Sequence, residues 1–480
     1  MADFWPTSIS FVAFLLLSIG VGIYSGSSKQ QSQQEDTTED YILASRDVNP
    51  WTIALSTVAT GNSGFMFIGL IGYAYQVGIS SIWIMVGWIT GDYLAWMWVH
   101  RRLRKFSEEK DVETIPSFLA HTPKGDLRWI TAISALAILI FLGAYAAAQL
   151  QAGSKALSVV FGWDYNVGSI LGAAIVVIYA FTGGAQASIR AGAIQGGVMV
   201  FSMIVLLVAS ITASGGIGTL WSQLTDIDPM LMQPTPPNLQ FGFVPFLIGW
   251  LMAGFGVVGQ PHIMIRTMAI DSEDSIEQAR NIYVVVYALF AIAAVGVGLT
   301  TRVLMPELMA GGDTELALPQ LAMQLLPGVL VGLILAGLFS ATISTADAQL
   351  LSCSAALTQD LFPKAAGSYM FVRIGTLLVT LVILGIALVG SDNVFTLVTF
   401  SWSALAASIG PLMIVRVLQL PISTPVGVAM MVAGTGTALF WRVGLNLSDA
   451  IYEALPGIVA GGLVYAVAWL WQKTRSQART

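Results

Sequence analysis

The stretch that decides the fold is ALSTVATGNSGFMFIGLIGYAY, which runs from Ala54 to Tyr75. Most of it is apolar enough to lie in a membrane, but its middle, ATGNSG (Ala59 to Gly64), contains two glycines and three small polar residues. Such residues favour other backbone conformations over a continuous helix. Because hydrocarbon offers no water to the freed backbone groups, a break here must be covered by protein or line a cavity.

Composition places the rest of the chain in the membrane as well. Of its 480 residues, 56% are hydrophobic and only 10% are charged, against about 25% charged residues in a typical soluble domain. The single cysteine, Cys353, excludes an intramolecular disulfide framework, and metal-ligand spacings such as HExxH and CxxC are absent from the sequence. We therefore expect no enzyme, no cofactor and no nucleic-acid partner.

A spanning helix needs about 20 apolar residues. Thirteen candidate spans lie at 7–25, 49–76, 79–98, 127–155, 165–182, 190–213, 241–266, 281–304, 326–358, 368–390, 394–415, 422–441 and 452–472. Of the 21 basic residues, 18 fall on one side of this alternation and three, Lys155, Arg302 and Arg442, on the other. The positive-inside rule then predicts a multi-pass plasma-membrane protein with its N-terminus outside and its C-terminus in the cytoplasm, and a bacterial inner membrane fits best.

The break at Ala59–Gly64 has two interpretations. Small residues are common where membrane helices cross, and this stretch alone fits packing somewhat better. Freed carbonyls can instead bind a cation, and the N-terminus of a half-helix can face an anion. A second interrupted span, LMAGFGVVGQPHIM (Leu251 to Met264), lies five helices later. An odd offset inverts orientation, which is the pattern of a transporter with two inverted five-helix repeats.

A third stretch supplies side-chain oxygens: LFSATISTADAQLLSCSAALTQDL, from Leu338 to Leu361. Ser340, Ser344 and Asp347 are four and three residues apart, so they share one helix face, and Thr345 flanks it. Any one of these hydroxyls can equally bond back to its own helix. Asp347 is either a functional carboxylate inside a span or a wet residue near the cytoplasmic end, and the sequence leaves both open.

Five longer motifs together indicate a resemblance to a known protein family. They are YILASRDVNPW (Tyr41 to Trp51), ATGNSGFMFIGLIG (Ala59 to Gly72), YAFTGG (Tyr179 to Gly184), FGVVGQPHIMIRTMAIDS (Phe255 to Ser272) and STADAQLLSCSAALTQDL (Ser344 to Leu361). Through them the chain resembles the sodium/solute symporter family. The resemblance implies an all-α membrane fold of the APC/LeuT type, with one domain divided into an extra N-terminal helix (7–25), two repeats (49–213 and 241–415) and extra C-terminal helices (422–472).

The resemblance also implies a function and its residues. It implies a sodium-coupled symporter that imports a small organic solute, proline or a related amino acid or compatible solute, by alternating access. Sodium would meet the carbonyls of Ala59, Asn62 and Ala341 and the hydroxyls of Ser344 and Thr345. The solute would lie beside Ser63, Gly64, Phe65, Tyr145, Gln260 and Pro261, and Arg46 would serve coupling or gating.

The sequence departs from the proline-carrying members of the family at four positions. Gly61 stands where they have an aspartate, and Gly192 where some members complete a second sodium site with an aspartate. Ala253 and Val257 replace two aromatic residues, so we expect a larger or differently shaped pocket. Asp347 with Ser340 is a candidate second cation site that replaces the missing charge. The alternative is a proton-coupled or sodium-independent transporter of the same fold, with Asp347 as the proton carrier.

Overall fold

The computed structural model describes residues 4–30, 42–123, 125–310, 313–365, 369–390 and 393–477, and the motif residue Tyr41 and the side chains of 179–183 lie outside the description. The described chain is helical throughout, with one isolated β-bridge between Val48 and Ile270. The α-helices are α1 (Phe4–Gln30), α3 (Pro50–Gly64), α4 (Leu70–Val77), α5 (Ile82–Ala95), α6 (Arg101–Glu109), α7 (Ile115–Ala120), α8 (Arg128–Ala137), α9 (Gly143–Phe161), α10 (Tyr165–Ala213), α11 (Ile217–Ile227), α12 (Phe243–Phe255), α13 (Pro261–Met268), α14 (Ser275–Leu304), α15 (Ala317–Leu325), α16 (Gly328–Ala355), α17 (Tyr369–Val389), α18 (Val394–Val417), α19 (Thr424–Leu439) and α20 (Ala454–Gln477).

Short 3-10 or π turns link or extend these helices. They are η1 (Ala44–Arg46), η2 (Phe65–Gly69), η3 (Gly78–Ser81), η4 (Trp96–His100), η5 (Ile138–Leu142), η6 (Pro229–Met232), η7 (Gly256–Gly259), η8 (Pro306–Ala310), η9 (Thr314–Leu316), η10 (Ala356–Leu361) and η11 (Phe440–Gly444).

The segment from α3 to α6 is helical over 60 consecutive residues, Pro50–Glu109, but it crosses the molecule twice. A straight helix of that length would be about 90 Å long. Instead, Gly78 adopts a φ of 80° and the chain folds back. Tyr283 of α14 consequently lies against both Gly61 of α3 and Asp92 of α5. This segment therefore holds two of the predicted spans.

The number of spans agrees with the sequence when broken helices are counted in this way. In the described part of the chain, nine helical segments are long and apolar enough to cross a membrane, and the bent pair α12–α13 makes ten. Dividing Pro50–Glu109 at Gly78 and adding the shorter apolar helices Phe4–Leu17 and Tyr165–Ile178 accounts for each of the thirteen segments. The expected all-helical membrane fold is confirmed.

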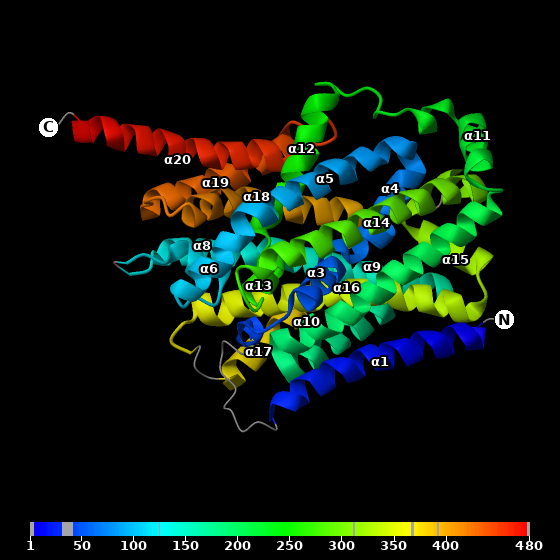
Figure 1. The fold of residues 1–480 in the computed structure, drawn as a ribbon, viewed down its shortest axis with the longest axis horizontal. Helices are drawn as coiled ribbons and strands as arrows, with labels where there is room; N and C mark the ends of the chain where they lie inside the picture. Colours follow the sequence, from blue (N-terminus) through cyan, green and yellow to red (C-terminus); the bar gives the residue numbers. More distant parts are fainter. Residues whose placement is uncertain are drawn as a thin grey trace.

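The long helices run side by side in one bundle (Figure 1). In α16 and α18 the most apolar window is 83% and 89% buried, whereas in α20 it is 22% buried, so the first two form the centre. On one side α1 packs against α10 and α16, and on the opposite side α19 and α20 pack against α18 (Figure 1). The outward side chains of the peripheral helices are apolar, including Leu378, Val382 and Val467, as lipid contact requires.

The start of α1 and the end of α20 lie at opposite ends of the bundle (Figure 1). One end carries α11 and α15, and the other carries α6 and the end of α13 (Figure 1); these are called the α11 end and the α6 end below.

Three helices are interrupted inside the bundle. In α3, Ser63 adopts φ 49° and ψ −171°. In α10, Gly184 adopts φ 53° and ψ −141°, so this element consists of two helices that meet at a kink, and they correspond to the spans predicted at 165–182 and 190–213. Between α12 and α13 the chain bends by 60°, and Gln260 is extended. The first and third breaks are those that the glycines of the sequence predicted.

Candidate functional site

The break in α3 leaves backbone donors that other groups satisfy. The Gly64 N–H donates to Oε1 of Gln149 on α9 at 2.7 Å, and the Phe65 N–H donates to Oγ of Ser63 at 3.1 Å. The Ser63 hydroxyl also pairs with the Tyr145 hydroxyl at 3.2 Å. Side chains of the protein thus replace the missing helical bonds, as a break inside the membrane requires.

Glycine is required at position 64 because two helices approach it closely. A Cβ there would lie 2.6 Å from the Ala152 Cβ of α9 and 3.1 Å from the Thr342 Cγ2 of α16. The glycine therefore packs the broken helix against α9 and α16 and frees backbone groups at the same time. The packing interpretation of ATGNSG therefore holds at Gly64.

Carbonyl oxygens released by the break face a hydroxyl of α16. Thr345 Oγ1 lies 2.9 Å from the Ala341 carbonyl oxygen, 3.0 Å from that of Thr60 and 3.4 Å from that of Ala59. One hydroxyl has a single proton to donate, so three acceptors exceed what it can satisfy. Four oxygens from two helices thus converge at one point, and such hard ligands suit a small cation.

The predicted ligands therefore fall into two groups. Ala59, Ala341 and Thr345 are brought together, and Thr60, which was not predicted, joins them. Ser344 Oγ is buried without a hydrogen-bond partner in the described structure. The Asn62 carbonyl instead accepts the Phe65 N–H, and the Asn62 side-chain amide is buried without a described partner.

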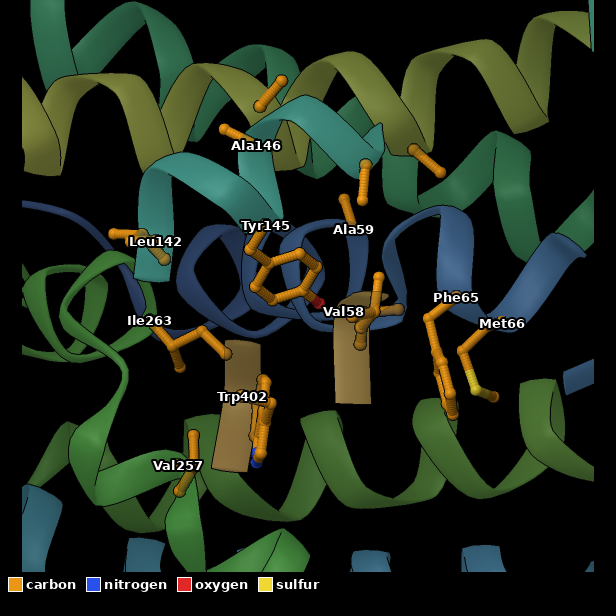
Figure 2. Packing of buried hydrophobic residues seen from close by; sticks show 14 of the residues in the cluster. Val58, Ala59, Phe65, Met66, Leu142, Tyr145, Ala146, Val257, Ile263 and Trp402 are labelled. Atoms are coloured by element: carbon orange, nitrogen blue, oxygen red, sulfur yellow. The ribbon is translucent and has the colours of Figure 1, made fainter. Parts of the chain in front are cut away.

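The second break brings an indole to the site from α18. Trp402 Nε1 donates to the Ala253 carbonyl at 2.7 Å, and Gln260 Nε2 donates to the Trp402 carbonyl at 3.0 Å. Figure 2 shows the Tyr145 ring reaching toward the Trp402 indole, with Val257 beside it; the two ring centroids are 6.4 Å apart. Trp402 of α18 thus packs beside the small residues Ala253 and Val257.

Close helix packing explains how α18 reaches this position. A Cβ on Gly256 would lie 2.7 Å from the Ala406 Cβ, and a Cβ on Gly259 would lie 2.6 Å from the Ala406 Cα. Both glycines lie in η7, just before Gln260 and Pro261. The break therefore lets α18 approach, and Pro261 starts α13 at a position where a missing N–H costs nothing.

A polar network follows on the α6 side of the two breaks. Arg266 of α13 donates to Ser56 Oγ at 3.0 Å, to Ser188 Oγ at 3.3 Å and to the His262 carbonyl at 3.1 Å. Asp347 of α16 interacts electrostatically with Arg266 and with Ser188, while its Oδ1 has no described hydrogen-bond partner. The carboxylate therefore has a fixed cation beside it, which the sequence analysis did not foresee.

Gly192 belongs to the same network. A Cβ at this position would lie 2.8 Å from Ser56 Oγ and 3.2 Å from Ser344 Oγ. A carboxylate side chain therefore has no room at position 192 in this arrangement.

A narrow cavity of about 20 Å³ borders this network. Its walls include Ser188, His262, Arg266, Leu351 and Ser352. Both imidazole nitrogens of His262 lack described hydrogen-bond partners, and the ring lies edge-on to Tyr145 at 5.8 Å. The cavity therefore approaches Tyr145 from the α6 side.

The α11 side is closed by stacked rings and an ion pair. Phe395 of α18 stacks on Tyr73 at 5.1 Å and on Phe65 at 5.3 Å. Buried Glu315 of η9 pairs with Lys155 at 2.7 Å and accepts the N–H groups of Val394 and Phe395 at the start of α18. The bonds of Glu315 join α9, η9 and α18, so the bundle is closed on the α11 side.

Arg46 lies at the α6 end, away from the breaks. It donates to Ser107 Oγ and to the Val112 carbonyl, each at 3.0 Å, and to the Met268 carbonyl at 3.5 Å. The neighbouring Val48 N–H donates to the Ala269 carbonyl at 3.2 Å. These bonds tie the entry of α3 to the end of α13, so the two broken helices are joined at their α6 ends.

Two broken helices packed around a central pair of long helices, with orphaned oxygens at the breaks, define a secondary transporter. The family model "Sodium:solute symporter family" matches residues 41–421. The chain belongs to the sodium:solute symporter family: it is a sodium-coupled solute symporter and not an enzyme.

Curated relatives agree with this assignment, and solved structures agree with the fold. Sodium/proline symporters of Staphylococcus aureus, from strains USA300 / TCH1516 and JH9, are each 30% identical to this chain over 492 aligned positions, which cover 98% of this chain and 93% of the relative. The structure of a Na+-coupled sialic acid symporter, in a substrate-bound outward-open state, superposes with a TM-score of 0.77 at 17% identity over 96% of this chain and 98% of that one. Mhp1, a nucleobase-cation-symport-1 family transporter, superposes with a TM-score of 0.58 at 17% identity over 90% of this chain and 94% of that one.

Proposed function

We propose that this symporter binds sodium between α3 and α16 and imports proline or a closely related solute with it. The sodium assignment depends on one observation, the three carbonyl oxygens within 3.4 Å of the Thr345 hydroxyl. Sodium placed there takes the carbonyls of Ala59 and Ala341 with the hydroxyls of Thr345 and Ser344. The unpartnered Ser344 Oγ supports its part in this set. Asn62 stays a proposed ligand through the second lone pair of its carbonyl.

The proposed solute site lies between the two breaks. Its residues are Ser63, Gly64, Phe65, Tyr145, Gln260 and Pro261. Gln149 Nε2 is a buried donor and Gln260 Oε1 a buried acceptor, and neither has a described partner. Buried amide groups without partners are rare, so a solute with both an acceptor and a donor fits. An amino acid offers a carboxylate to Gln149 and an ammonium group to Gln260.

Coupling follows from the location of the ion. Sodium that joins α3 to α16 stabilises the arrangement in which the solute site is complete, and solute binding then lets the repeats rock. By linkage, sodium and solute raise each other's affinity by the same factor. The membrane potential adds about 2.3 kcal/mol per charge per 100 mV. In this scheme Arg46 acts in gating, because it braces the α6 ends of both broken helices.

A second cation at Ser340 and Asp347 is part of the same proposal. The unpartnered Asp347 Oδ1 supports it, whereas the nearby Arg266 already offsets the carboxylate charge. Asp347→Asn distinguishes a second cation site from a simple ion pair with Arg266. The quantity to measure is the number of sodium ions transported per solute. A lower ratio than in wild type supports a second site, and an unchanged ratio leaves Asp347 as the partner of Arg266 alone.

The proposed orientation places the α6 end in the cytoplasm of a bacterium. The basic residues gathered at that end, including Arg101, Arg102 and Arg104, support it through the positive-inside rule. The first repeat (49–213) and the second (241–415) would then each contribute one broken helix to the site, with 7–25 and 422–472 outside the repeats. Proton-coupled or sodium-independent transport is the second candidate, because Gly61 and Gly192 remove two family carboxylates.

The test is uptake of labelled proline into liposomes that contain the purified protein, with and without an inward sodium gradient. We expect sodium to stimulate uptake, and Ser344→Ala to weaken this stimulation. The control is Thr435→Ala on α19, a hydroxyl outside the proposed site that bonds back to its own helix, to the Met431 carbonyl, at 2.9 Å. Proline uptake at the same rate with and without the sodium gradient would contradict the sodium assignment. Sodium-dependent thermal stabilisation by a different solute, without proline uptake, would replace proline alone.

A further inference from the structure

A second buried carboxylate, Asp92, lies on α5 beside the broken helix. It is nine residues before Arg101 and ten after Ile82, so about 14 Å of helix separates it from either end of the span. That is close to the middle of a hydrocarbon layer about 30 Å thick. An ionisable side chain at this depth is costly and marks a functional site by default.

The hydroxyl of Tyr283 lies between Asp92 and the break in α3. Tyr283 of α14 donates to Asp92 Oδ2 at 2.6 Å, and a Cβ on Gly61 would lie 3.3 Å from the same Tyr283 hydroxyl. The carboxylate is therefore one hydrogen bond away from the backbone of α3 at the residue before Asn62. Asp92 Oδ1 is buried and has no hydrogen-bond partner in the described structure.

No cation offsets this carboxylate among the described residues. The helix α12 and the turn η7, which pack along α5, contain no titratable residue, and neither does α3. From α14, Tyr283 and Tyr287 face it, and Tyr145 of α9 lies near both. Arg280 of α14 lies over the Tyr93 ring at 4.9 Å and pairs with Glu277 at 3.2 Å. Asp92 thus differs from Asp347, which has Arg266 beside it.

The surroundings of Asp92 favour a proton over a metal cation. The Trp96 indole stacks on Tyr283 at 5.3 Å, and Tyr283 contacts Tyr287 at 5.4 Å. Rings of this kind offer few of the oxygens that a hard cation needs. On the other side of Trp96, His100 stacks on the indole at 4.9 Å, and both of its nitrogens are buried without described partners. Asp92, Trp96 and His100 are four residues apart and share one helix face that leads toward the α6 end.

We propose that Asp92 is a proton site of the transport cycle: it holds a proton in the closed arrangement described here and releases it toward His100 when the α6 side opens. The Asp92 carboxylate takes a proton from water when the α11 side opens. When the α6 side opens, the Asp92 carboxyl loses this proton and becomes a carboxylate again, and the His100 imidazole takes it up and passes it to water on that side. The change in charge reaches the break through the Tyr283 hydroxyl. One proton then crosses with each solute, in addition to sodium. The movement of a proton together with the solute rests on the proposed function, whereas the protonation of Asp92 does not.

Two measurements test it. In liposomes with a trapped pH-sensitive dye and a clamped membrane potential, wild-type protein is expected to acidify the lumen as labelled proline enters with sodium. Asp92→Asn is expected to lose the acidification and to reduce net uptake at least tenfold, while it keeps exchange of labelled for unlabelled proline. The matched control is Asp226→Asn at an exposed position of α11, which should behave as wild type. Proline entry without acidification in wild type, or unchanged acidification in Asp92→Asn, would overturn the proposal.

The second measurement needs no solute, so it separates failure of the proton site from failure of the proposed function. The infrared spectrum of the purified protein should contain a C=O band of a buried, protonated carboxyl group that Asp92→Asn removes and Asp226→Asn leaves. Tyr283→Phe keeps the ring against Trp96 but deletes the hydrogen bond to Asp92, so it should shift the band. A band that survives in Asp92→Asn, or that does not move in Tyr283→Phe, would show that the proton is elsewhere. Absence of any proline uptake with the band intact would reject the proline proposal and not the site.

Discussion

Trp402 supplies an aromatic side chain beside Ala253 of α12 and Val257 of η7, which are both small. Its indole N–H is fixed by the Ala253 carbonyl at 2.7 Å, and its own carbonyl fixes Gln260 at 3.0 Å. The same residue therefore shapes the proposed solute pocket and holds the second break in its extended form. A tryptophan with both roles should affect solute binding more than overall folding.

We predict that Trp402→Phe raises the KM for solute about five- to tenfold and leaves the half-saturating sodium concentration unchanged. The variant keeps a ring but leaves the Ala253 carbonyl unsatisfied, at a cost of about 1–3 kcal/mol. Trp441→Phe is the matched control, because Trp441 also donates its indole N–H to a backbone carbonyl, that of Ile451, at 2.9 Å, but outside the site. Equal solute kinetics in both variants would remove Trp402 from the pocket.

At the scale of the elements, glycines set how closely the helices around the breaks can pack. Gly64 brings α3 against α9 and α16, and Gly192 brings α10 against Ser56 and Ser344. The sequence of ATGNSG predicts that a helix breaks, since its composition disfavours a continuous helix. It does not predict which helices approach, because this depends on residues more than 80 positions away.

The helix α10 offers a direct comparison of two glycines. A Cβ on Gly192 would lie 2.8 Å from Ser56 Oγ, whereas a Cβ on Gly197 would meet no atom within 4 Å. We predict that Gly192→Ala lowers the free energy of unfolding by about 1–3 kcal/mol through overpacking, and that Gly197→Ala is neutral or raises it by up to about 1 kcal/mol. Thermal unfolding in detergent measures both. Equal stability of the two variants would mean that Ser56 and α10 move apart without cost.

The sequence does not show which helices approach one another, and this explains which residues of the proposed site it could not predict. Ser344 and Thr345 enter the proposed site through the family resemblance, and their hydroxyls inside an apolar span are visible in the sequence. Gln149 and Thr60 were missed: Gln149 meets Gly64 only after folding, and Thr60 acts through a carbonyl that every residue has. Arg266 is the last residue of the span predicted at 241–266, whereas in the structure it is buried in α13 beside Asp347.

At the scale of the whole molecule, the bundle is closed at the α11 end, and a narrow cavity lies on its α6 side. The closure combines the stacked rings around Phe395 with the pair between Lys155 and Glu315. Because Glu315 also accepts two N–H groups at the start of α18, one carboxylate holds three elements. Opening this end must break those bonds.

We predict that Glu315→Gln shifts the molecule toward a form open at the α11 end. Removing one partner of a buried ion pair costs about 3–5 kcal/mol, and this cost falls only on the closed form. A cysteine at position 65, in a chain whose Cys353 is replaced by Ala, should then react with a bulky maleimide at least tenfold faster. Glu307→Gln, at an exposed position near the same end, is the control. Unchanged labelling in Glu315→Gln would show that the pair does not hold the closed form.

The central claim is that sodium binds between the broken helix α3 and the hydroxyls of α16. The most direct measurement is equilibrium binding of radioactive sodium to purified wild-type protein and to Thr345→Val, which keeps the shape of the side chain but lacks the hydroxyl. We predict saturable binding in wild type and a loss of affinity of about tenfold or more in the variant, as expected when a contact to a charged group worth about 1.5–3 kcal/mol is removed. Sodium binding of equal affinity in the two proteins would contradict it.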